Sequence, residues 1–149
     1  MKQTLVLLAF ALVSGCGSQD EKPDPAIEPW MVGAEVDGWL SAYARAEATK
    51  THASGEHPAA EAEMSRRELA LLDMFQRQED EVNKVFSKYL AGCDREKEQI
   101  IQKRNQIQVV GRTLTPEEKK FVDETGPRIL EEISARARAL RVLKQSLEK

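Results

Sequence analysis

The chain has 149 residues and a formal net charge of −3, and 32% of its residues are charged while only 5% are aromatic. A chain of this size suits one domain with a core of its own, and this composition favours helices with narrow apolar stripes. The nearly balanced charge, with no aromatic residues among the densest basic residues, argues against a nucleic-acid-binding protein.

Residues 1–15 have the pattern of a secretory signal peptide. One basic residue, Lys2, precedes nine consecutive apolar residues, and two small residues follow them. Nine residues are too few to cross a hydrocarbon core of about 30 Å as a helix. We therefore expect this segment to be a cleaved targeting signal and not a membrane span.

The cysteine after this segment is the sharpest indication of where the protein is held. The sequence Val13-Ser14-Gly15-Cys16 resembles the lipobox of bacterial lipoproteins, in which an aliphatic residue and two small residues precede an obligatory cysteine. The resemblance implies that Cys16 carries a thioether-linked diacylglycerol, becomes the mature N-terminus and receives a further acyl chain on its amine. Two or three acyl chains hold a protein firmly to a bilayer, so the protein would be anchored to a membrane and not embedded in it. The alternatives are a secreted protein cleaved nearby and a chance cysteine in an ordinary signal peptide.

The residue after Cys16 bears on which membrane this is. Gram-negative lipoproteins with an aspartate there tend to stay in the inner membrane, and this chain has Gly17 instead. By the same resemblance, the expected location is the inner leaflet of the outer membrane, facing the periplasm.

Residues 16–33 are expected to form a flexible acidic tether. Its polar part, 17–29, has three prolines among acidic residues and almost no apolar side chains. Prolines favour extended conformations and like charges repel, so this part could hold the domain roughly 40 Å from the bilayer.

The helical domain is expected from residue 34 onward. A first helix over 34–51 is predicted by apolar residues at three- and four-residue steps, namely Val36, Trp39, Leu40 and Tyr43. The stretch after it breaks the helix, and Pro58 suits an early position of the next one.

A long helix is predicted over 59–90. Its apolar stripe approximates a heptad repeat and consists of Met64, Leu71, Phe75, Val82, Val85, Phe86 and Tyr89. Two interpretations stay open after it. Gly92 can end this helix and Asp94 can cap the next, or one helix can extend over 59–110, because a glycine inside a helix costs only about 1 kcal/mol. We favour a turn at Gly92.

Two further boundaries are expected near the C-terminus. Gly111 should end a helix, and Thr115-Pro116-Glu117-Glu118 is a capping box that starts another helix at Pro116. Gly126-Pro127 should interrupt that helix, because proline lacks an amide proton and clashes with the preceding turn. A terminal helix is then indicated by the stripe Ile129, Leu130, Ile133, Ala137, Leu140, Leu143 and Leu147.

These patterns predict an all-α domain over residues 34–149. Since the connections are short and no segment alternates with period two, we expect an antiparallel bundle of three to five helices with at least one long helix, after a disordered N-terminal tether. An elongated hairpin-like arrangement is the second interpretation.

The two histidines, His52 and His57, are weak candidates for a metal site. They are five residues apart, an awkward helical spacing, and the loop between them supplies no soft third ligand. We expect an exposed loop without a metal, in which His57 pairs with Glu61 across one helical turn.

Cys93 would be the only thiol left in an oxidising compartment if Cys16 is lipidated. Its place on a stripe with Phe86, Ile100 and Ile107 favours a small buried apolar residue. An intermolecular disulfide that forms a homodimer and a reactive thiol are the alternatives.

Charge is shared unevenly along the chain. Residues 16–80 carry 6 basic and 14 acidic residues, whereas residues 81–149 carry 15 basic and 11 acidic residues. Arg136, Arg138 and Arg141 belong to the densest basic group and are a candidate face for an acidic partner. The alternative is an ordinary solvated helix face.

No arrangement of nucleophile and base, and no phosphate-binding or metal-binding motif, is recognisable in the chain. We therefore expect a protein that is not an enzyme and needs no cofactor. The expected function is a protein-interaction or assembly module of the cell envelope, with the membrane and an envelope protein as partners. The competing class is a binder of small ligands or envelope polymers, in which Trp30, Trp39 and Tyr43 would line an apolar pocket or contact lipid. Their helical spacing favours core positions instead, above all for Trp39. An exclusion or inhibitor lipoprotein is a further alternative.

Overall fold

The computed structural model describes residues 24–51, 55–109 and 111–149, and in these residues it contains helices and no strand. The predictions for the signal peptide, the lipobox with Cys16, the tether up to residue 23 and His52 lie outside the described residues. The helices are α1 (Pro29–Thr49), α2 (Glu56–Arg77), α3 (Glu79–Gln108), α4 (Pro116–Lys120), a π-helical turn η1 (Phe121–Thr125), and α5 (Gly126–Leu147). The all-α prediction is confirmed for the described part of the chain.

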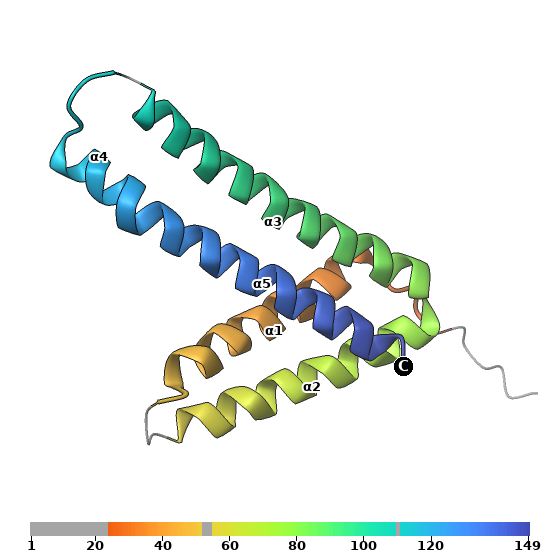
Figure 1. The fold of residues 1–149 in the computed structure, drawn as a ribbon. Helices are drawn as coiled ribbons and strands as arrows, with labels where there is room; N and C mark the ends of the chain where they lie inside the picture. The colour runs from red at the N-terminus through yellow and green to blue at the C-terminus, as the bar shows by residue number, and fades with distance from the viewer. Residues whose placement is uncertain (1–23, 52–54, 110) are drawn as a thin grey trace, which may run out of the picture.

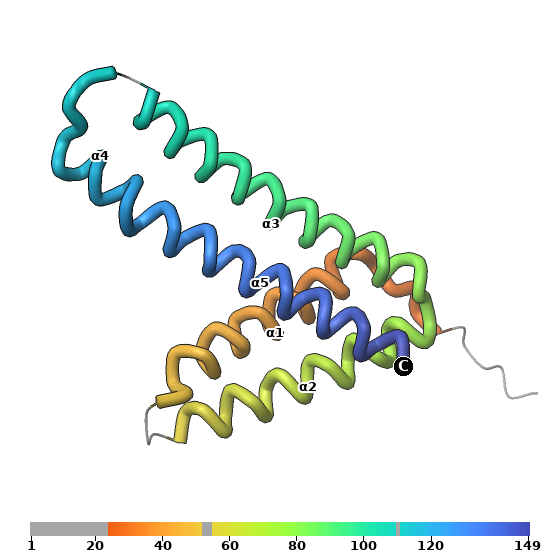
Figure 2. The backbone as a smooth tube through the Cα atoms, in the orientation of Figure 1, coloured from red at the N-terminus to blue at the C-terminus, as the bar shows by residue number. Residues whose placement is uncertain are grey.

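The helices form two pairs that cross each other (Figure 1). Helix α2 runs back along α1, and α5 runs back along α3. Helix α3, with 30 residues, meets the expectation of at least one long helix, but the helix predicted over 59–90 is divided between α2 and α3. The end of the α3–α5 pair that carries α4 extends beyond the α1–α2 pair, as the tube in Figure 2 shows.

The first helix begins at Pro29, five residues before the expected start at residue 34. Proline suits this position because its missing amide proton has no intrahelical partner there in any case. Ile27, two residues earlier, is 5% exposed and belongs to the core. Residues 27–33 were expected in the tether, and the burial of Ile27 fixes them to the helical domain instead.

The break in the long helical stretch falls at Gln78, so both interpretations that placed it at Gly92 or nowhere were wrong. Gln78 has φ −148° and ψ 71°, which no helix continues through, and α3 runs from Glu79 past Gly92 to Gln108. Three acidic residues occupy the first turn of α3. Acidic side chains stabilise a helix N-terminus because the unpaired amide groups there carry partial positive charge.

The capping box at Thr115 is confirmed. The amide of Glu118 donates to Thr115 Oγ1 at 3.2 Å, and the amide of Thr115 donates to Glu118 Oε2 at 2.9 Å. Upstream of it, α3 ends at Gln108 and Gly111 adopts a left-handed φ of +61°, a conformation that favours glycine.

The expected interruption at Gly126-Pro127 takes a milder form than a break. The amide of Gly126 donates to the carbonyl of Phe121, five residues earlier, so the chain makes one wide turn and continues directly into α5. A turn of this kind inserts one extra residue into the helix. Pro127 then stands in the first turn of α5, where its missing amide proton costs nothing.

The core is built by one apolar face of each long helix. The largest fully buried side chains are Phe86, Leu71, Leu140, Leu143, Val32, Val36 and Val82. The predicted terminal stripe is confirmed, because Ile133, Ala137, Leu140, Leu143 and Leu147 are all buried. At about 25 cal/mol per Å² of apolar surface removed from water, this shared core is the main stabilising contribution to the fold.

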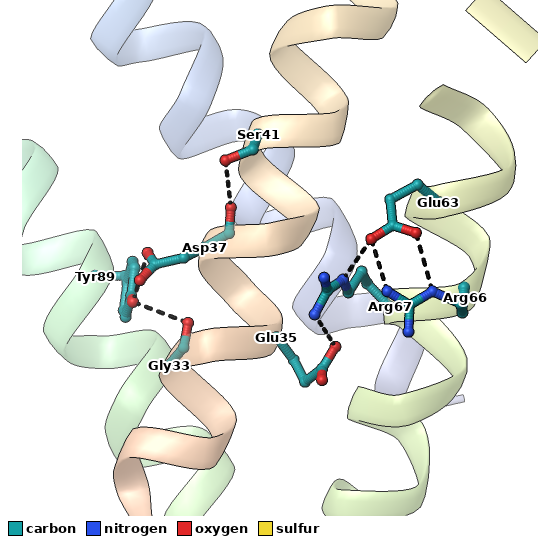
Figure 3. A network of polar contacts seen from close by, with 8 residues as sticks. All are labelled: Gly33, Glu35, Asp37, Ser41, Glu63, Arg66, Arg67 and Tyr89. Carbon is teal, nitrogen blue, oxygen red and sulfur yellow. Dashed lines mark hydrogen bonds and ion pairs between the residues drawn. The ribbon is translucent and has the colours of Figure 1, made fainter. Parts of the chain in front are cut away.

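A network of hydrogen bonds and ion pairs joins α1 to α2 (Figure 3). Arg67 of α2 donates to Glu35 of α1 at 3.0 Å and to Glu63 at 2.8 Å. Its guanidinium lies so close to Gly38 that a Cβ there would be 2.6 Å from Arg67 Cζ. Hydrogen bonds from Arg66 and Arg67 lower the pKa of Glu63 to about 2. Gly38 weakens α1 as a helix, but the absence of a side chain there leaves the space that the Arg67 guanidinium occupies.

Within the described ranges, no helix is both long enough and apolar enough to cross a membrane.

Candidate functional site

A groove of about 840 Å³ lies between α1, α3 and α5. Apolar residues of all three helices line it: Leu40 of α1 is partly exposed, whereas Val85 of α3 and Leu140 of α5 are buried. Pro29 and Trp30 form its rim at the start of α1. Pockets that bind small molecules or protein segments have this combination of an apolar wall and a few polar groups.

Trp30 is the aromatic residue of this rim, and it is 71% exposed. It is exposed because Ile27 and Val32 occupy the buried positions at the start of the domain, which turns Trp30 away from the core. A tryptophan left in water is a candidate anchor, since this residue is enriched among those that dominate binding energy at interfaces.

Tyr89 connects α3 to α1 inside the groove (Figure 3). Its hydroxyl lies 2.7 Å from Asp37 Oδ1 and 3.2 Å from the carbonyl oxygen of Gly33. The hydroxyl has one proton, and the shorter bond to the charged acceptor is the stronger of the two. This bond holds the two walls of the groove at a fixed separation.

The pKa of Tyr89 is raised to about 12, first by burial and then by its hydrogen bond to Asp37 and the charge of that carboxylate. Because the ordinary value is 10, the protonated phenol stabilises the fold fully below about pH 10, and this contribution is lost as the pH rises toward 12. We expect the phenolate absorbance that disappears in Tyr89→Phe to titrate with a midpoint near 12. A midpoint at 10 would contradict the bond to Asp37.

Cys93 lies on the inner wall of the groove and is 3% exposed, as expected for a small buried residue on this stripe. It forms no disulfide within the described residues. Arg136 of α5 closes the wall beside it with an ion pair to Glu96 of α3. Burial acts to lower the pKa of Arg136, but hydrogen bonds to Glu96 and Cys93 outweigh it, so this pKa lies above its ordinary value. The homodimer through Cys93 stays a prediction.

The three arginines proposed as one acidic-partner face are placed differently by the structure. Arg136 lines the groove and pairs with Glu96, whereas Arg138 is exposed and pairs with Glu131 at 2.7 Å. Arg141 is exposed and makes no ion pair with the residues that the structure describes. Only Arg136 of the three lies in the groove.

The aromatic residues that the sequence grouped as a binding pocket are also separated. Trp39 is 4% exposed, donates from Nε1 to Glu68 at 2.9 Å, and stacks on Tyr43 with ring centroids 5.4 Å apart. Neither ring lines the groove that Trp30 borders. Trp39 is thus a core residue, and the proposed shared pocket of three aromatic residues was wrong.

His57 makes the predicted contact with Glu61. Its Nε2 lies 3.2 Å from Glu61, and its Nδ1 lies 2.9 Å from the carbonyl oxygen of Ala46 on α1. Among the residues that the structure describes, no group of three or more histidine, cysteine and acidic side chains is arranged to hold a metal ion.

Sequence reasoning missed the residues that α3 contributes to the groove. Lys88, Gly92 and Arg95 all line it, and their spacing of four and three residues puts them on one helix face. Lys88 and Arg95 are exposed and make no hydrogen bond or ion pair within the described part of the chain. The spacing could have been recognised, but the helices that complete the groove could not.

The fold does not require a glycine at position 92 of the groove. A Cβ at this position would meet only Arg95 Nη2, at 3.9 Å, which is ordinary contact distance. We expect Gly92→Ala to raise the free energy of unfolding by about 1 kcal/mol, because a glycine inside a helix is destabilising by that amount relative to alanine. Urea denaturation measures it, with Ala91→Gly on the exposed face of α3 as the matched opposite change. A loss of stability in Gly92→Ala would contradict the open space above this residue.

Comparison with known proteins adds no relative, because no protein family, no curated protein and no solved structure matches the chain.

Proposed function

We propose that the protein is a lipid-anchored lipoprotein of the cell envelope, an antiparallel helical bundle that works by binding a protein partner. The groove between α1, α3 and α5 is the observation that supports this most. It combines an apolar wall, the exposed Trp30 at its rim, and two cations, Lys88 and Arg95, without a partner in the described residues. Apolar anchors surrounded by polar groups are what protein-binding surfaces share.

The lipobox supports the other half of the proposal. With lipid on Cys16, the chain reaches the domain at Ile27, the first residue buried in the core. The eleven residue steps between them can span at most about 40 Å if fully extended. Trp30 and the rim of the groove therefore belong to the part of the domain nearest the anchor. Lipid attachment on Cys16 would place the groove close to the inner leaflet of the outer membrane.

The experiment is crosslinking in living cells of the tagged, full-length protein, followed by mass spectrometry of the captured proteins. The proposal expects one dominant envelope protein, captured by the wild type and lost with Cys16→Ser. Capture of nothing, or of the protein itself alone, would contradict it.

A second candidate function is favoured by the size of the groove. A volume of about 840 Å³ falls in the range of small-molecule pockets, so a small apolar ligand is the competing occupant. Native mass spectrometry of the protein purified from its own membrane distinguishes the two. A retained molecule of a few hundred daltons would favour the ligand binder, whereas the protein mass alone favours the protein-binding function.

A further inference from the structure

The charges of the groove are unevenly matched. Three cations, Lys88, Arg95 and Arg136, line it together with two carboxylates, of which Glu96 pairs with Arg136 and Asp37 accepts a hydrogen bond from the neutral phenol of Tyr89. The two remaining cations, Lys88 and Arg95, have no such partner in the residues that the structure describes. The charge that the groove offers to an incoming molecule is thus positive, and it favours an acidic one.

The spacing of these cations points to an elongated molecule. Lys88 and Arg95 are seven residues apart on α3, which corresponds to about 10.5 Å along the helix axis. A single phosphate or carboxylate group is too small to span this separation. Two carboxylates two turns apart on a second helix have the same separation. The spacing therefore favours an acidic helix over the headgroup of a single lipid.

Gly92 lies between the two cations, on the same face of α3. The space that its side chain would occupy is open, although the glycine weakens the longest helix of the domain. A glycine in such a place lets another backbone approach closely. Across the groove, Ala34 and Leu40 of α1, with Trp30 at the rim, offer accessible apolar surface for the other face of the incoming helix.

We infer that the groove binds an acidic amphipathic helix of the partner protein, with Lys88 and Arg95 against its carboxylates and Gly92 under its backbone. The inference rests on the proposed protein-binding function and adds the chemistry of the partner segment. An amphipathic helix that lays its apolar face into a groove is a recurring mode of recognition. Trp30 then covers one end of the bound helix from the rim.

The test replaces Gly92 by a photo-crosslinking amino acid in the full-length protein in cells and identifies the attached peptide by mass spectrometry. Ala34, an exposed residue of the opposite wall, is the second probe position, in case the bulky group at residue 92 blocks binding. We expect both positions to label one segment of another envelope protein, with acidic residues at helical spacing. An adduct with a second copy of this chain, with a lipid, or with a segment lacking acidic residues would overturn the inference.

Charge reversal supplies the matched comparison. Lys88→Glu combined with Arg95→Glu should reduce the yield of the adduct at least tenfold. Arg138→Glu combined with Arg141→Glu makes the same change in net charge outside the groove and should leave the yield unchanged. Equal loss in both variants, or none in either, would overturn the inference.

Probes at two positions outside the groove distinguish failure of this inference from failure of the proposed function. Leu69 of α2 and Val142 of α5 are exposed by 68% and 66% and do not line the groove. If probes there capture a partner while those at residues 34 and 92 do not, the protein-binding function stands and the groove is the wrong surface. If no position captures another protein, both proposals fail.

Discussion

Replacing Phe86 by alanine is expected to lower the free energy of unfolding by about 3–5 kcal/mol. Phe86 is completely buried, and it is the largest of the fully buried side chains in the core cluster shared by α1, α2, α3 and α5. The substitution removes its apolar surface from the core and leaves a cavity that the rigid helices cannot fill. Since domains of this kind are stable by about 5–15 kcal/mol in total, the variant should lose a large fraction of its stability.

Urea denaturation followed by circular dichroism measures this effect. The control is Leu69→Ala on α2, where the leucine is 68% exposed and the change should stay within about 0.5 kcal/mol. If Phe86→Ala cost no more than Leu69→Ala, α3 would not pack on the other helices as described.

Replacing Cys16 by serine is expected to abolish lipid attachment. Cells fed labelled palmitate should incorporate it into the wild-type protein and into Cys93→Ser, but not into Cys16→Ser. The reason is that the resemblance to a lipobox implies acylation of Cys16, whereas Cys93 is buried in the helical domain. Label retained in Cys16→Ser would contradict the lipobox interpretation.

The effect of the proposed lipid anchor on membrane binding can be tested separately from cleavage of the signal peptide. Residues 17–149 exported behind an ordinary cleavable signal lack Cys16 and any lipid on it, so the proposed function expects them in the periplasmic fraction and not with membranes. Two or three acyl chains make binding firm, so nearly all of the wild-type protein should sediment with membranes instead. Sedimentation of the unlipidated chain would show a second membrane contact.

The helix-forming segments could be predicted from the sequence because their signals are local. The apolar stripe of α5 and the capping box at Thr115 both depend on residues within a few positions of one another, and the structure confirms both. The helix break at Gln78 was not predicted. Gln78 breaks the helix without glycine or proline, and the remaining signal was the acidic run that follows, Glu79-Asp80-Glu81. The sequence indicated Gly92 as the helix break instead. A glycine inside a helix costs only about 1 kcal/mol, which is small compared with the stabilisation from the packing of Val85, Phe86 and Cys93.

The groove could be predicted only in part, because it depends on contacts between distant segments. The face of α3 with Lys88, Gly92 and Arg95 follows from helical spacing alone. That α1 and α5 pack on either side of this face does not, and neither does the pairing of Arg136 with Glu96. For the same reason the sequence grouped Trp30 with Trp39, although the packing of α1 buries Trp39 and leaves Trp30 in water.

If a partner occupies the groove in the cell, it should shield the groove from reagents there, and cysteine accessibility measures this shielding. With Cys93→Ser as background, Ala34→Cys places a thiol in the groove and Leu69→Cys places one outside it. Both should react with a membrane-permeant maleimide in the purified protein. In intact cells, we predict that the thiol at residue 34 is protected while the one at residue 69 stays reactive. Equal reactivity of residue 34 in cells and in the purified protein would show an unoccupied groove and contradict the account.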